Sequence, residues 1–293
     1  MTDREHIRNP IEWSMDTLKT ANEAVGRAGH SLRTPEEIRE SPLPAVNRIG
    51  PADLKDVLAR GLGDLGAYRT DVLFVCIVYP LAGLILAWTA FGYEMLPLVF
   101  PLVSGFALIG PVAAVGLYEI SRRREQGVDI TWADAFGVVR APAFGAILVL
   151  GLVLLAIFLL WLAAAYGIYA ATLGPEPPAS IGSFLRDVLT TGPGWAMIVA
   201  GVGVGFLFAL LVLTISVVSF PMLLDRDVGL YTAVATSVRA VVQNPVTMAI
   251  WGLIVASGLV LGSIPVLLGL IFVMPVLGHA TWHLYRKVVP AEG

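Results

Sequence analysis

The sequence predicts an all-α membrane protein with six transmembrane helices in three hairpins, each preceded by an amphipathic helix at the cytoplasmic interface. Hydrophobic residues make up 57% of the 293 residues and charged residues only 14%, whereas soluble domains contain about 45–50% apolar and about 25% charged residues. Several long stretches also contain no Asp, Glu, Lys or Arg, namely residues 72–93, 95–118, 141–175, 188–224 and 240–285. Since one membrane crossing needs about 20 apolar residues, these stretches have room for six crossings.

The charge-free stretches divide the chain into a tail and a membrane domain. Residues 1–50 are polar and contain several prolines, which favours a mostly flexible cytoplasmic tail with a candidate helix over residues 10–28. That helix is either a docking element or a marginal helix in a flexible segment. Residues 51–289 form the membrane domain, whose spans we expect at about 72–92, 96–120, 143–171, 194–221, 245–262 and 265–287.

Amphipathic segments are predicted before each hairpin. The apolar stripe of the first consists of Leu54, Val57, Leu58, Leu62, Leu65 and Tyr68. Charged residues, Asp64 among them, are assigned to the opposite face. A second segment begins near Trp132 and a third near Tyr231, and a shift of 99 residues superimposes Trp132 on Tyr231 and Arg140 on Arg239. The three segments therefore suggest one unit used three times, as an internal pseudo-repeat.

The second and sixth spans share a further pattern. Pro111 is followed by Tyr118, Glu119, Arg122 and Arg123, and the triplet continues to Arg124. Pro275 is followed at the same four offsets by Trp282, His283, Arg286 and Lys287. Matching hairpins of this kind predict pseudo-symmetric packing.

Two local patterns concern helix starts and helix contacts. Asn244 and Pro245 are typical of a helix start, placed where the third amphipathic helix turns into the fifth span. Gly201 and Gly205 lie four residues apart in the fourth span and favour close packing, either against the fifth span or between copies of the chain. The sequence leaves the oligomeric state open.

The basic residues predict the orientation, because Lys and Arg collect on the cytoplasmic side. They fall on one side of the predicted spans, whereas Arg186 falls on the other. Both termini are therefore expected on the cytoplasmic side of the membrane. The longest outward loop, residues 172–192, contains a short amphipathic piece around Phe184, Leu185 and Val188.

Candidate chemistry is sparse. His279 and His283 lie four residues apart on one helix face, a spacing that suits either a metal site or interfacial hydrogen bonding. Glu119 pairs with His283 across the pseudo-repeat in the sharpest site hypothesis, whose alternative is a structural ion pair. A single cysteine, Cys76, excludes cysteine-based metal sites. The net charge of −3 implies no nucleic-acid partner, and no catalytic residue, metal or cofactor is predicted.

The joint at Asn244 and Pro245, followed by Trp251 and Gly252, and the ending from Pro275 to Arg286 resemble a family of uncharacterised bacterial six-span inner-membrane proteins. Some members of that family are labelled putative cytochrome c oxidase subunit. The resemblance implies a location in the bacterial inner membrane and, through that label, a link to a respiratory complex. The missing catalytic constellation and the crowded cytoplasmic face favour a non-enzymatic accessory, scaffold or assembly component of a larger membrane complex, with lipid and complex subunits as partners. The alternative from the sequence is a transporter or channel for a small or lipophilic solute.

Overall fold

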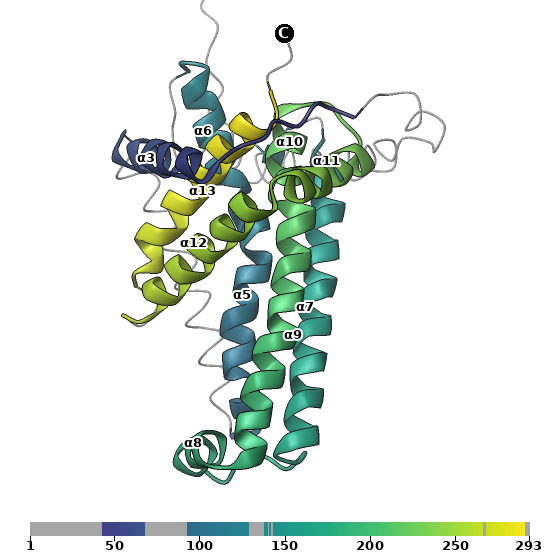
Figure 1. Cartoon of the computed structure of the whole chain (residues 1–293), viewed down its shortest axis with the longest axis vertical. Coiled ribbons are helices and arrows are strands. Elements are labelled where there is room, and N and C mark those ends of the chain that lie inside the picture. The colour runs from purple at the N-terminus through teal and green to yellow at the C-terminus, as the bar shows by residue number, and fades with distance from the viewer. Residues whose placement is uncertain are drawn as a thin grey trace, which may run out of the picture.

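The computed structural model describes residues 43–67, 93–128, 138–139, 141, 143–265 and 268–290. Within these ranges the secondary structure consists of helices and contains no strand. Two long helices stand side by side, shorter helices gather at one of their ends, and a single short helix lies at the other (Figure 1). The all-helical class predicted from the sequence is confirmed for the described part of the chain.

Four helical segments in the described part of the chain are long and apolar enough to cross a membrane. They are Leu96–Glu125, Phe144–Thr172, Gly192–Asp225 and Pro245–Ser263. The first comprises the second half of the 3-10 helix η1 (Tyr93–Leu98) and the helices α5 (Val99–Ala113) and α6 (Val115–Glu125). The second is α7 (Phe144–Thr172), the third is α9 (Gly192–Ser216) with α10 (Ser219–Asp225), and the fourth is α12 (Pro245–Ser263). These segments match the second to fifth predicted spans.

The other two predicted spans have different outcomes. The first, at about 72–92, lies outside the described residues, as do the candidate helix 10–28 and the amphipathic segment near Trp132. The sixth corresponds to α13 (Leu270–Val288), which is not among the four candidate spans. Its second half contains the polar residues His279, His283, Arg286 and Lys287, so α13 is not a continuous apolar stretch. This helix packs against α3, α6 and α12.

A polar cap forms at one end of the two long helices. We use this name for α3 (Pro51–Ala67), α6, α10, α11 (Leu230–Gln243) and the second half of α13, which surround the upper end of α7 and α9 in Figure 1. The remaining helix, α8 (Ile181–Thr190), lies at the opposite end, between α7 and α9 in the chain. The basic residues of the cap and Arg186 of α8 are thus at opposite ends of the molecule.

The joint between α11 and α12 has the predicted helix start, with Pro245 in the first turn of α12. Asn244 occupies the N-cap position, but its side chain makes no capping hydrogen bond to α12. Its Oδ1 atom accepts a hydrogen bond from the Ile49 backbone N–H at 2.8 Å, and its Nδ2 atom donates to the Asn47 carbonyl at 3.0 Å. The Asn47 N–H in turn donates to the Val288 carbonyl at 2.8 Å. The extended residues 43–50 are therefore held along this joint, beside the end of α13.

The glycines of the fourth span have different surroundings from those expected. A Cβ atom at Gly205 would lie 3.1 Å from the ring of Trp161 in α7, and one at Gly201 would meet nothing within 4 Å. Gly252 of the fifth span lies close to the fourth, because a Cβ atom there would be 3.2 Å from Leu213 of α9. Gly205 thus allows α9 to approach α7, because a flat indole ring occupies the space beside it.

The two prolines of the pseudo-repeat also differ. The helix is interrupted at Ala114, three residues after Pro111, so that α5 and α6 are separate helices. Pro275 lies inside the continuous helix α13. The predicted repeat is not confirmed, and the interruption after Pro111 directs α6 into the cap.

Candidate functional site

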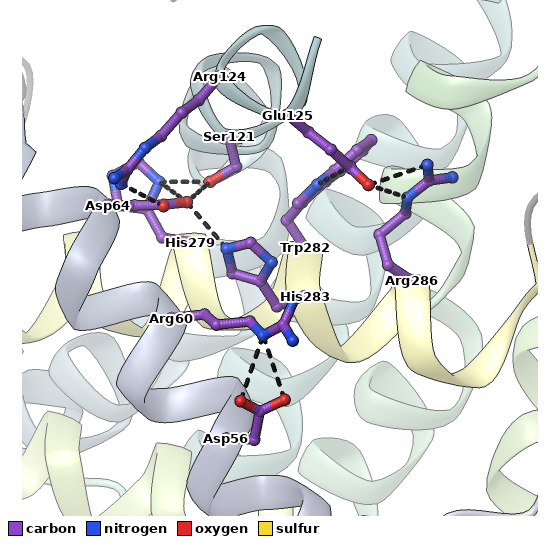
Figure 2. Close-up of polar contacts among 10 residues, drawn as sticks. All are labelled: Asp56, Arg60, Asp64, Ser121, Arg124, Glu125, His279, Trp282, His283 and Arg286. Atoms are coloured by element: carbon purple, nitrogen blue, oxygen red, sulfur yellow. Dashed lines mark hydrogen bonds and ion pairs between the residues drawn. The ribbon is translucent and has the colours of Figure 1, made fainter. Parts of the chain in front are cut away.

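A buried aspartate, Asp64, lies at the centre of a polar cluster between α3, α6 and α13 (Figure 2). The buried face of α3 consists of Leu54, Val57, Gly61, Asp64 and Leu65. Gly61 permits close contact, since a Cβ atom there would lie only 2.7 Å from the Ala280 backbone nitrogen of α13. This close packing brings the Asp64 carboxylate, which is 5% exposed, against the polar side chains of α6 and α13.

The Asp64 carboxylate binds side chains from both neighbouring helices. Its Oδ1 atom accepts a hydrogen bond from Nη1 of Arg124 at 2.5 Å. Its Oδ2 atom accepts one from Oγ of Ser121 at 2.6 Å and is 2.9 Å from Nε2 of His283. His279 completes the cluster, with Nδ1 2.8 Å from Oγ of Ser121 and 4.0 Å from Oδ2 of Asp64. One carboxylate therefore joins three helices through charge-assisted hydrogen bonds.

The hydrogen bonds define the proton arrangement on His279. Because the Ser121 hydroxyl donates to Asp64, it accepts from Nδ1 of His279, which must therefore hold a proton. The Nε2 atom is buried and makes no hydrogen bond within the described residues. A second proton on this ring would be an N–H buried without an acceptor, which is costly. The ring is accordingly neutral, with the lone pair on Nε2.

The order of the groups differs from that of a hydrolytic triad. In such a triad the histidine lies between the serine and the carboxylate and takes the serine proton. Here Ser121 lies between His279 and Asp64, so the serine proton goes to the carboxylate. Ser121 is 1% exposed and His279 is 0% exposed. The cluster is arranged to hold helices together and gives a substrate no access to the serine.

The environment of Asp64 favours its charged form. Burial acts to raise the pKa of the carboxyl group, but the hydrogen bonds from His283 and Ser121 outweigh that effect and hold the pKa below its ordinary value. Asp64 is therefore ionised at neutral pH. A buried charge of this kind is tolerated only when it is paired, and Arg124 supplies the countercharge.

Further ion pairs extend the cluster across the cap. Glu125 of α6 accepts hydrogen bonds from the Trp282 indole at 3.2 Å and from Nε of Arg286 at 3.1 Å (Figure 2). Asp225 of α10 accepts from the Tyr285 hydroxyl at 2.7 Å and from Arg286 at 3.2 Å. Two more pairs link Lys287 of α13 to Asp53 and Asp56 of α3. Together these contacts join α13 to α6, α10 and α3, so α13 is the common partner within the cap.

The residues singled out from the sequence are only partly brought together. His279 and His283 do lie at one polar site, but the carboxylate they share is that of Asp64. Glu119, 2% exposed, binds Arg122 and Arg123 of its own helix, at 2.8 and 2.7 Å. The hypothesis that Glu119 pairs with His283 is therefore replaced by a pair of Asp64 with His283. The apolar stripe suggested that Asp64 faces away, although its position seven residues after Val57, two helical turns, indicates the same face.

The donor set of the cluster does not suit a metal ion. Among the described residues, no group of three or more His, Cys, Asp or Glu side chains is placed to hold one. The Asp64 oxygens already bind Arg124, Ser121 and His283. The chemical role that this geometry supports is charge neutralisation inside the cap.

Comparison with known proteins extends these observations. Residues 99–225, which include α5 to α10, match the model of a family described as predicted integral membrane protein (DUF2189). No curated protein and no solved structure matched the chain. The family match and the four apolar helices together identify the chain as an integral membrane protein with several membrane-crossing helices, similar over residues 99–225 to this family.

Proposed function

We propose that this protein is a non-enzymatic accessory or scaffold component of a larger membrane complex in the bacterial inner membrane, for instance a respiratory complex. The polar cap faces the cytoplasm and holds the partner. The apolar helices anchor the cap in the bilayer.

The observation that carries this proposal is that the carboxylates of the cap are bound to side chains of the protein itself. Asp64, Glu119, Glu125 and Asp225 all bind cationic side chains of the same chain. Asp64 joins α3 to α6 and α13, Glu125 joins α6 to α13, and Asp225 joins α10 to α13. Such a network makes a rigid surface, and rigid surfaces bind partners without a large loss of conformational entropy.

The positions of the charged residues argue against an enzyme, a transporter or a channel. A catalytic or transport carboxylate must meet a substrate or an ion, and ionisable groups in transport pathways lie within the spans. The helices α7 and α12 contain no Asp, Glu, Lys or Arg, and the charges of the other two candidate spans lie at their cap ends. A transporter or channel function is therefore not favoured.

Photocrosslinking in native membranes tests the proposal. A photoreactive amino acid is placed at Lys55 of α3 or at Gln126 after α6, both exposed positions on the cap, and at Val199 of α9 as the control on the apolar helix surface. The proposal predicts that the two cap positions crosslink to the same protein, which also co-purifies in mild detergent in a fixed ratio. Isolation of the chain alone, with no common crosslinked protein from the two cap positions, would refute it.

A further inference from the structure

The short helix α8, at the end opposite the cap, has two chemically distinct faces. Its apolar arc consists of Ile181, Phe184, Leu185, Val188 and Leu189. Its polar arc consists of Ser183, Arg186, Asp187 and Thr190. At 3.6 residues per turn these sets occupy opposite sides of the helix. A ten-residue helix with this division requires an apolar environment along one side.

The protein covers only half of that apolar arc. Phe184 packs its ring edge on Tyr169 of α7, with the ring centroids 6.3 Å apart, and Val188 is half-buried beside the start of α9. Ile181, Leu185 and Leu189 are 45%, 50% and 56% exposed. These three residues form a continuous edge, one turn apart, which we call the α8 edge.

The direction of α8 is fixed by a tight corner with α9. The Thr191 hydroxyl accepts from the Gly194 N–H at 3.0 Å and donates to the Asp187 carbonyl at 2.6 Å. A Cβ atom at Gly194 would lie 2.2 Å from that same carbonyl oxygen, so glycine is required there. The Trp195 indole, 55% exposed, donates to the Leu189 carbonyl at 3.1 Å and thereby lies beside the α8 edge.

The length of α7 places this corner at the far membrane surface. α7 has 29 residues, which at 1.5 Å per residue gives a length of about 44 Å. A bilayer measures about 40–45 Å including its headgroup regions. With the first residue of α7 at the cap-side headgroups, its last residue, and therefore α8, lies in the opposite headgroup region. Exposed tryptophan is typical of that region.

We propose that α8 lies flat in the membrane interface opposite the cap, with the α8 edge and Trp195 inserted among lipid acyl chains. The edge is continuous with the exposed apolar surface of α9, where Val199, Val202 and Phe206 face outward. Arg186 and Asp187 carry opposite charges on the polar arc, so α8 itself has no net charge. Insertion is therefore driven by apolar burial and does not require anionic lipid. It fixes the depth of the α7 and α9 pair in the bilayer.

Depth-dependent fluorescence quenching tests this placement in the full chain. The background is Cys76→Ser, which removes the single cysteine. Leu189→Cys reports on the α8 edge and Arg186→Cys, three residues earlier on the polar arc, is the matched control. Both variants are labelled with an environment-sensitive fluorophore and reconstituted into phosphatidylcholine vesicles. Quenching is measured with nitroxide-labelled acyl chains and with aqueous iodide.

The proposal predicts several-fold stronger nitroxide quenching at position 189 than at 186, and the reverse order for iodide, with both unaffected by added NaCl. Equal iodide access at the two positions would place α8 in water and overturn it. A label at 189 shielded from both quenchers would also overturn it, because protein would then cover the edge. Leu185→Cys and Thr190→Cys form a second pair for the same comparison if either first variant fails to elute as a single species.

Discussion

Replacing Asp64 by asparagine removes the charge at the centre of the cap while keeping the size of the side chain. The carboxylate is 5% exposed and binds Arg124, Ser121 and His283. Breaking one partner of a buried ion pair costs about 3–5 kcal/mol. The Arg124 side chain is 37% exposed and can turn to water, so we expect the lower end of that range, about 3 kcal/mol.

Thermal unfolding in mild detergent measures this effect. For a chain of this size, 1 kcal/mol corresponds to about 2–4 °C, so Asp64→Asn should lower the unfolding temperature by about 6–12 °C. Asp56→Asn is the matched control, because Asp56 lies on the same helix two turns earlier and its side chain is 44% exposed where it binds Arg60 and Lys287. Exposed pairs contribute little to stability, so this control should unfold close to the wild-type temperature.

Equal unfolding temperatures for the two variants would refute the reasoning. That result would mean that Asp64 is as well hydrated as Asp56, and that the contacts among α3, α6 and α13 do not depend on its charge. A loss of stability in Asp64→Asn alone would instead show that the cap is held by this carboxylate.

Three further predictions concern the cap. The folded protein holds the pKa of Asp64 below its ordinary value, so the stabilisation that this carboxylate provides is present above the ordinary value, about 3.9, and is lost as the pH falls through the lower folded value. The gap in unfolding temperature between wild type and Asp64→Asn should therefore close below about pH 4. Gly61→Ala should destabilise the protein by about 1–3 kcal/mol, because the new Cβ atom would meet the α13 backbone. Gly63→Ala is the control: its Cβ atom would meet nothing within 4 Å, so in the same unfolding assay it should be neutral or stabilising by up to about 1 kcal/mol. Equal effects of the two variants would contradict the close packing of α3 on α13. Asn244→Ala should cost about 1 kcal/mol, because it leaves part-buried backbone groups of Asn47 and Ile49 unpaired. It should also speed limited proteolysis within residues 43–50, an effect that Gln243→Ala at the exposed neighbouring position should lack. Unchanged cleavage would count against the contact.

The sequence was sufficient to predict where long apolar helices lie. Residues 144–172 and 192–216 could only be buried in lipid or in protein, because they contain no charged side chain over more than the thickness of the hydrocarbon core of a bilayer. The break at Asn244 and Pro245 was also predictable, since proline removes a backbone donor and suits the first turn of a helix. These features depend on local composition, which a sequence displays directly.

The partners of the polar side chains were not predictable in the same way. Asp64 and His283 are 219 residues apart in the chain. The pseudo-repeat suggested a pair of Glu119 with His283, whereas Glu119 binds Arg122 and Arg123 of its own helix. Only the packing of α3 across α13 decides which acid meets the histidines. That packing depends on Gly61, where the absence of a side chain lets two backbones approach.

The sequence by itself determined that the chain is a multi-pass helical membrane protein with its basic residues concentrated beside one set of helix ends, because hydrophobicity and charge are properties of each segment alone. The tertiary structure decided that α13 belongs with the polar cap, that Asp64 is the buried charge, and that Gly205 faces Trp161. The physical reason is that hydrogen bonds and close packing depend on which surfaces meet, and segments far apart in the chain meet only in the folded molecule.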